Sequence, residues 1–72
     1  MKINDEFGAR LRSIRMKNEI SQEKLAELSG LHRTYISSLE RGGRNPTLTT
    51  LNAIAKALHI EISYLVSEIG DE

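Results

Sequence analysis

The sequence predicts an all-α fold, with a single domain of five short helices over residues 1–72. Apolar residues recur at intervals of three and four, as they do on the buried face of a helix. Glycines and the one proline divide this pattern into short segments. One segment, ISYLV, has the composition of a strand, but it has no second strand to pair with. A chain of this length buries only about 60% of its unfolded surface, so dimerisation would stabilise it.

The first helix is expected from about Asp5 to Lys17. Phe7, Leu11 and Ile14 recur at i, i+4 and i+7, which places them on one face. Asp5 adds a negative charge to the first turn, where it complements the helix dipole.

The second helix is expected to begin after Ser21 and to end at Gly30. Serine is a typical N-cap, and glycine tolerates the left-handed backbone that often follows a helix. Leu25, Ala26 and Leu28 should face inward.

Three further helical segments complete the predicted fold. The third helix should run from near His32 to Gly42, and RGGRNPT then forms a turn. Thr47 caps a fourth helix, which should continue to His59. A last helical turn or two should follow, because Ser63 and the absence of any other strand favour a helix there. The apolar residues of this segment outnumber what one short helix needs for a monomer core. These residues are Ile60, Ile62, Leu65, Val66 and Ile69.

The charges cancel over the whole chain but are unevenly placed. Residues 1–44 hold nine Lys or Arg against six Asp or Glu, whereas residues 45–72 hold one against four. Nucleic-acid binding depends on where charge lies more than on its total. The neutral composition is therefore compatible with a DNA partner at the basic front of the molecule.

The second and third helices have the spacing of a helix-turn-helix over about residues 22–41. Counting from Gln22, Ala26 is fifth, Gly30 ninth, Ile36 fifteenth and Leu39 eighteenth. Ala26 is small where the helices cross, and Gly30 permits a tight turn. Helix pairs of this kind also occur in proteins that bind no DNA, so the exposed face of the third helix must decide.

That exposed face carries small and donor-rich side chains. Stepping 100° per residue from an inward Ile36 places Thr34 and Arg41 near the opposite side, flanked by Arg33, Ser37 and Ser38. Serines allow close approach to a groove, and an arginine can donate two hydrogen bonds to guanine. A solvated helix face is the alternative for any one of these residues.

The turn that follows favours phosphate binding. Arg41, Arg44 and Asn45 carry donors, and the amides of Gly42 and Gly43 are expected to point at a phosphate.

Two further residues complete the predicted surface. Gln22, at the start of the second helix, should hold the same DNA backbone from the other side. Tyr35 has two possible roles, as a core flank or as a hydroxyl contact with the sugar-phosphate backbone.

The stretch SQEKLAELSGLHRTYISSLERG, followed by RNPTL, resembles the lambda-repressor-like helix-turn-helix family, and in particular the controller proteins of restriction-modification systems. The resemblance extends over nearly the whole chain. It implies a five-helix domain that binds palindromic operators as a homodimer through its last helices. It also implies control of the chain's own promoter and of an endonuclease gene, and two dimers on adjacent sites are one further possibility.

Carried over residue by residue, the resemblance assigns roles on the DNA. Arg33 and Arg44 are the leading base readers. The predicted base contacts are Arg33, Arg44, Thr34 and Ser37; the predicted backbone contacts are Gln22, Tyr35, Ser38, Arg41, Gly43, Asn45 and Thr50.

The resemblance also assigns roles away from the DNA. It pairs Arg15 with Glu40 in a structural ion pair. Glu23 and Glu27 match an acidic patch that touches RNA polymerase in activators of the family, although a solvated acidic face explains them equally well. The predicted dimer interface lies within about residues 60–70 and comprises Ile62, Tyr64, Leu65, Val66 and Ile69.

Two positions depart from the family pattern. Many members have glycine where this chain has Glu19, so either Glu19 is strained or Asn18 takes the left-handed conformation. Members often have lysine where Gly43 stands, which removes one charge from the phosphate-binding loop.

An enzyme is not expected. His32 and His59 are 27 positions apart, the chain has no cysteine, and no carboxylate cluster with metal spacing accompanies either histidine. No cofactor or metal is predicted. The alternatives are a phage-type repressor, a DNA-binding antitoxin, or a protein-interaction module whose basic face binds an acidic protein. Without a hydrophobic leader or an apolar run long enough for a membrane span, the sequence predicts a soluble cytoplasmic protein.

Overall fold

The computed structural model describes residues 2–70, and these residues form five α-helices without a strand. The helices are α1 (Lys2–Lys17), α2 (Gln22–Ser29), α3 (Arg33–Glu40), α4 (Leu48–Leu58) and α5 (Ile62–Leu65). The predicted all-α fold is confirmed. The first helix begins at Lys2 rather than near Asp5, because residues 2–4 contain no glycine or proline that would stop it.

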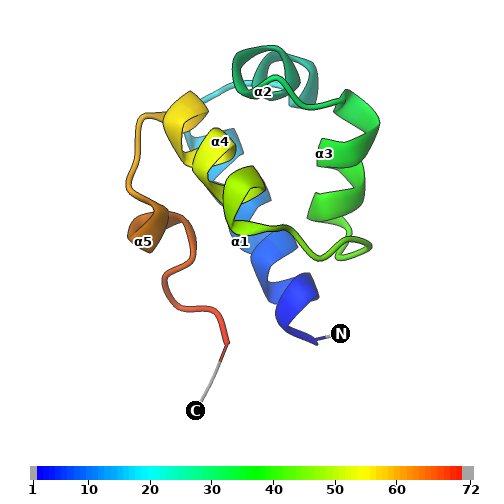
Figure 1. Cartoon of the computed structure of the whole chain (residues 1–72), viewed down its shortest axis with the longest axis vertical. Helices are drawn as coiled ribbons and strands as arrows, with labels where there is room; N and C mark the ends of the chain where they lie inside the picture. The colour runs from blue at the N-terminus through cyan, green and yellow to red at the C-terminus, as the bar shows by residue number, and fades with distance from the viewer. Residues whose placement is uncertain (1, 71–72) are drawn as a thin grey trace.

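The helices pack around one core to which each of them contributes. α3 packs against α1 and α2, α4 packs against α2, and α5 lies against α1 and α4 on the side away from α3 (Figure 1). The core residues are Phe7, Leu11, Ile14, Leu25, Ala26, Ile36, Leu39, Ile54, Ala55, Leu58 and Leu65. Leu28, which was expected to face inward, is 49% exposed because it lies on the outer side of the short helix α2.

The helix ends follow the predicted caps. Lys24 N donates to the Ser21 hydroxyl at 3.0 Å, and Gly30 ends α2 with a φ of 78°. Thr47 caps α4 in the same way through Thr50 N. Of the two alternatives at the first turn, it is Glu19 that takes the left-handed conformation, with a φ of 58°.

Gly8 brings α1 and α3 into backbone contact. A Cβ atom at this position would lie 2.5 Å from Leu39 O and 2.6 Å from Glu40 O, which is closer than any side chain tolerates. Gly8 is buried in the interior of α1, where glycine costs helix stability. This role of Gly8 was not predicted, although a glycine within a helical pattern is itself a signal of close packing.

Over residues 2–70, no helix is long and apolar enough to cross a membrane.

Candidate nucleic-acid interface

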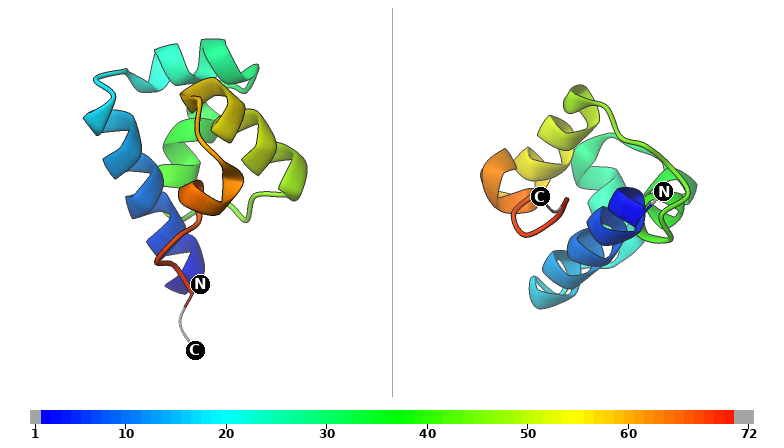
Figure 2. Two further views of the ribbon diagram at one scale, coloured as in Figure 1. Left: turned by 90° about the vertical axis from the view of Figure 1, so that its left-hand side faces the viewer. Right: turned by 90° about the horizontal axis from the view of Figure 1, so that it is seen from below.

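The helix-turn-helix forms as the spacing predicts. Ile36 and Leu39 are fully buried and attach α3 to the core, while Ala26 is buried where α2 meets its neighbours. The left-handed Gly30 allows α2 and α3 to lie at a steep angle to each other (Figure 2). The opposite face of α3 is therefore presented to solvent.

That face holds most of the predicted contact residues. Arg33, Thr34 and Arg41 are exposed, and Ser37 and Ser38 are half-buried. An open groove of about 560 Å³ runs along this face. It is lined by Gly30, Leu31, His32, Thr34, Tyr35, Ser38, Arg41, Arg44 and Thr50. Residues predicted on α3, in the turn and on α4 thus meet at one surface.

His32 also lines this groove, although it was not predicted as a contact residue. His32 is the N-cap of α3 and is exposed, but its side chain makes no capping hydrogen bond. The first amides of α3 therefore lack the side-chain acceptor that a serine or threonine would supply, and this end of the helix is left able to bind an anion. The position of His32 at the start of the predicted third helix, where the backbone is extended, was the signal that could have indicated this role.

Arg44 and Tyr35 pack against each other. The Arg44 guanidinium carbon lies 5.5 Å from the centre of the Tyr35 ring, within the range of a cation–π interaction. Tyr35 is half-buried and packs against the core, as its core-flank role requires, while it also lines the groove. The contact holds the arginine of the turn beside the exposed face of α3.

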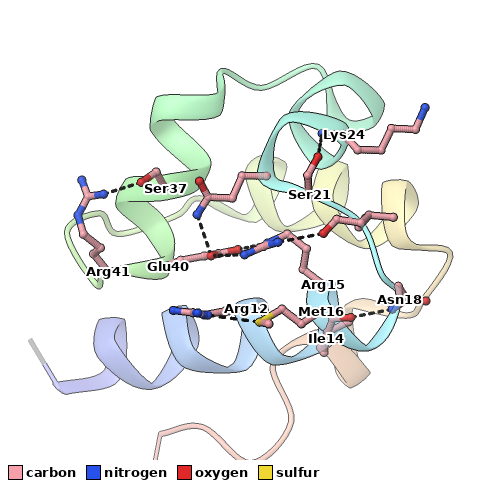
Figure 3. A network of polar contacts seen from close by, with 12 residues as sticks. Arg12, Ile14, Arg15, Met16, Asn18, Ser21, Lys24, Ser37, Glu40 and Arg41 are labelled. Carbon is pink, nitrogen blue, oxygen red and sulfur yellow. Dashed lines mark hydrogen bonds and ion pairs between the residues drawn. The ribbon is translucent and has the colours of Figure 1, made fainter.

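Arg41 and Ser37 are also joined, by a hydrogen bond from Arg41 Nη1 to the Ser37 hydroxyl (Figure 3). The pair spans one turn of α3. Ser37, a predicted base contact, is therefore already held by a predicted phosphate contact in the free chain.

The prediction that Gly42 and Gly43 offer free amides is wrong. Gly42 N donates to Leu39 O at 3.0 Å, and Gly43 N donates to Ser38 O at 2.9 Å. Both amides satisfy the last carbonyls of α3, as in a helix C-cap built around a left-handed glycine. The amide of Gly43 thus cannot be a phosphate ligand in this conformation.

Gly42 has a separate steric role. Its φ is 80°, and a Cβ atom there would lie 2.0 Å from Asp5 Oδ1. This residue therefore lets the turn pass close to the first part of α1.

An ion-pair network underlies the surface. Arg15 Nε donates to Glu40 Oε2 at 2.6 Å and Arg15 Nη2 to Glu40 Oε1 at 2.9 Å, so the predicted pair is present and bidentate (Figure 3). Arg15 also donates to Ile20 O at 2.9 Å. The side chains of the pair are only 11% and 4% exposed. The pair joins α1 to the end of α3 and supports the recognition surface from behind.

The network shifts the pKa values of both partners. Burial alone would raise the pKa of Glu40, but hydrogen bonds from Arg15 and Gln22 and the nearby positive charges outweigh it, so this pKa is lowered. The hydrogen bond to Glu40 likewise raises the pKa of Arg15. Gln22 donates to Glu40 Oε1 at 3.0 Å, which commits one of its two amide hydrogens and fixes its side chain.

Asn45 and Thr50 lie at the edge of the groove region. Asn45 is exposed in the turn, and it also lines a small cavity beside Pro46 that is separate from the groove. The Thr50 side chain is half-buried, lines the groove, and accepts a hydrogen bond from the Thr47 hydroxyl at 3.2 Å.

The acidic pair of α2 lies away from this groove. Glu23 and Glu27 are both exposed, and Lys24 Nζ lies 3.6 Å from Glu27 Oε1. A lysine therefore partly neutralises the acidic face.

The predicted dimer residues divide into two groups. Leu65 is fully buried in the core of its own chain, so its assignment to an interface is wrong: its side chain has no surface left to offer. Ile62, Val66 and Ile69 are half-buried against the core, and Tyr64 is 46% exposed. These four residues belong to α5 and the segment that follows it, and α5 lies on the side of the molecule away from α3 (Figure 1).

Comparison with known proteins identifies the family to which this chain is similar. Residues 11–65 match the model of a helix-turn-helix family. Control protein C.SmaI of Serratia marcescens is 50% identical over 70 residues, which cover 97% of this chain and 83% of that protein.

Solved structures agree with the sequence match. The restriction-modification controller protein C.AhdI from Aeromonas hydrophila has a TM-score of 0.84 at 47% identity, covering 86% of this chain and 94% of that one. A mutant of the controller C.Esp1396I bound to its highest-affinity operator site has a TM-score of 0.79 at 34% identity, covering 85% of this chain and 80% of that one.

These matches confirm the predicted resemblance to restriction-modification controllers. The matched proteins are named as control or controller proteins rather than as enzymes, in agreement with the expectation that the chain is not an enzyme. With its helix-turn-helix, its groove and these relatives, the chain belongs to the lambda-repressor-like helix-turn-helix family of transcription regulators.

Proposed function

We propose that this chain is the controller of a restriction-modification system, which binds palindromic operators as a homodimer and regulates its own gene and that of the endonuclease. The observation that supports it best is the groove along α3, where predicted base and phosphate contacts from three segments meet. Arg33 and Arg44 are the proposed base readers, because both are exposed and can present a guanidinium to guanine. In a bacterium this activity belongs in the cytoplasm.

The arrangement of the helices favours a dimer through α5. α3 and α5 lie on opposite sides of the molecule, which measures 22 Å across each of its two shorter axes (Figure 1). A two-fold axis beside α5 would therefore separate the two α3 helices by no more than about twice that width. One turn of DNA, about 34 Å, falls within this range. Tyr64 and the exposed parts of Ile62, Val66 and Ile69 would supply the interface.

Two regulatory features accompany the proposal. Glu23 and Glu27 of α2 are exposed and free to meet RNA polymerase when the dimer lies beside a promoter. Two dimers on adjacent operators would allow one concentration of protein to activate and a higher one to repress.

Selection of bound duplexes from a random pool, at low and at near-physiological salt, tests the proposal. The expected result is a palindrome whose half-sites are about one helical turn apart. Sedimentation at tens of micromolar should show a dimer. Failure to enrich any sequence, with binding that vanishes at physiological salt, would contradict the proposal and favour a protein-interaction module.

A further inference from the structure

The side chain of Arg10 in α1 contacts the end of α5 and the turn that follows it. Its Nη2 donates to Tyr64 O at 2.7 Å and to the Ser67 hydroxyl at 2.7 Å. Its guanidinium carbon lies 4.6 Å from the centre of the Tyr64 ring. One side chain therefore contacts the backbone, the ring and the following turn of the segment proposed to form the dimer interface.

The α5 segment has few other restraints. It is four residues long, and its N-cap, Glu61, makes no side-chain hydrogen bond. Leu65 is its one fully buried residue and fixes how deeply the segment sits in the core. Ile62 and Val66 are only half-buried against the core, and the contacts from Arg10 add polar and ring contacts that restrict rotation of the segment. The segment packs beside α1 and α4, so α1 is placed to supply this restraint (Figure 2).

The contact carries a cost for the folded monomer. Arg10 Nε is buried without a hydrogen-bond partner, and Arg10 forms no ion pair within residues 2–70. A buried donor without an acceptor is destabilising, so a well-packed apolar side chain of similar length would serve the monomer as well or better. The cation lies over the Tyr64 ring, and Tyr64 as a whole residue is still 46% exposed.

We propose that Arg10 is a positioning residue, which fixes the orientation of α5 and Tyr64 so that the two α3 helices of the dimer meet DNA at one half-site spacing. This inference rests on the proposed dimeric operator binding and adds the residue that sets its geometry. α1 carries the effect, because it also joins α3 through Gly8 and through the pair of Arg15 and Glu40.

The test compares Arg10→Met with Lys17→Met, which removes one positive charge from the exposed end of α1. The probes are duplexes with the selected half-sites at the preferred spacing and at one base pair more and less. For Arg10→Met, we expect unfolding near the wild-type temperature, dimerisation about tenfold weaker, and a smaller ratio of affinities between preferred and altered spacings. Lys17→Met should retain the wild-type ratio.

A second variant, Arg10→Lys, decides the matter if the methionine variant does not fold. Lysine keeps the charge but cannot hold Ser67 and stack on Tyr64 together, so the spacing ratio should again fall. A wild-type ratio in the variant that folds would overturn the role of Arg10 while leaving operator binding intact. A wild-type protein that shows no preferred spacing would overturn operator binding itself, and the inference with it.

Discussion

At the scale of single residues, position along α3 separates the proposed reading of bases from the proposed attachment to phosphates. Arg33 is the first residue of α3 and is exposed. A guanidinium in this position can donate two hydrogen bonds to guanine in the major groove. Arg41 instead lies beyond the end of α3 and is joined to Ser37.

We therefore expect Arg33→Ala to weaken binding of the selected operator by about 1–3 kcal/mol and to relax preference at one base position. Arg41→Ala is the matched control, since it removes the same group from the other end of α3 and should weaken all duplexes alike. Affinities for operator and random duplexes at one salt concentration provide the measurement. Equal losses on both duplexes for Arg33→Ala would refute base reading.

A second prediction at the residue scale concerns Glu40 and the dependence of folding stability on pH. Its pKa is lower in the folded chain than the usual value of about 4.3, so the ionised form favours folding. The stability from the pair is present above the unfolded pKa and is lost as pH falls through the folded one. Glu40→Gln should cost about 3 kcal/mol at pH 7, because it leaves Arg15 buried without a charged partner.

Chemical unfolding of both proteins between pH 7 and pH 3 checks this expectation. The difference between wild type and Glu40→Gln should begin to shrink as the pH falls below the usual pKa of about 4.3 and should continue to shrink until the pH is below the lowered pKa of Glu40 in the folded chain. Glu27→Gln, at an exposed surface pair, should change stability little at any pH. A difference that persists undiminished at pH 3 would show that the charge of Glu40 contributes nothing.

At the scale of helices, the contact of α1 with α3 makes an unusual prediction for Gly8. Alanine normally stabilises a helix interior by about 1 kcal/mol relative to glycine. At Gly8 the added methyl would meet Leu39 O and Glu40 O, so the helices must separate. We expect Gly8→Ala to destabilise the chain by about 2–3 kcal/mol. Ser13→Ala, on the exposed side of α1, should be neutral or slightly stabilising, and thermal unfolding of the two variants distinguishes them.

At the turn between α1 and α2, by contrast, we expect a substitution that increases the stability of the chain. Glu19 has a φ of 58°, a conformation that glycine adopts without strain. Glu19→Gly should therefore stabilise the chain by about 0.5–1 kcal/mol. Asn18→Gly, one residue earlier, should destabilise it, because Asn18 Nδ2 donates to Ile14 O at 2.8 Å. If both glycines lower the unfolding temperature, strain at Glu19 is not significant.

These elements show what the sequence could predict. Helix order, the caps at Ser21 and Thr47 and the turn at Gly30 depend on neighbouring residues, and all of them were predicted. The roles of Gly8 and Arg10 depend on helices that meet only in the folded chain: a glycine within a helical pattern indicates close packing but not its partner, and no local pattern indicates Arg10.

Two errors at the candidate site have similar origins. The amides of Gly42 and Gly43 were misassigned because a glycine turn after a helix fits both a phosphate loop and a helix cap. The burial of Leu65 depends on how far α5 sinks between its neighbours, which spacing does not specify.

At the scale of the whole molecule, a chain with no net charge should still bind DNA in a strongly salt-dependent way. The formal net charge is zero, but the basic residues of the groove, Arg41 and Arg44, are concentrated on the face that carries α3. Affinity depends on the phosphates that this face neutralises rather than on the total charge. A plot of log affinity against log salt should therefore be linear and steep.

The slope of this plot also reports the number of phosphate contacts that the protein makes. Each phosphate contact contributes about 0.9 to the slope, and a dimer loses two equivalent contacts when one residue is changed. Arg41→Ala should reduce the magnitude of the slope by about two, whereas Lys17→Ala, at the exposed end of α1 and outside the groove, should leave it unchanged. Titrations of one operator duplex at several salt concentrations supply the slopes. A reduction of the slope by about one would indicate that a single protomer touches the DNA backbone through Arg41. An equal reduction in both variants would mean that the electrostatic field of the whole chain, rather than the groove, attracts the DNA.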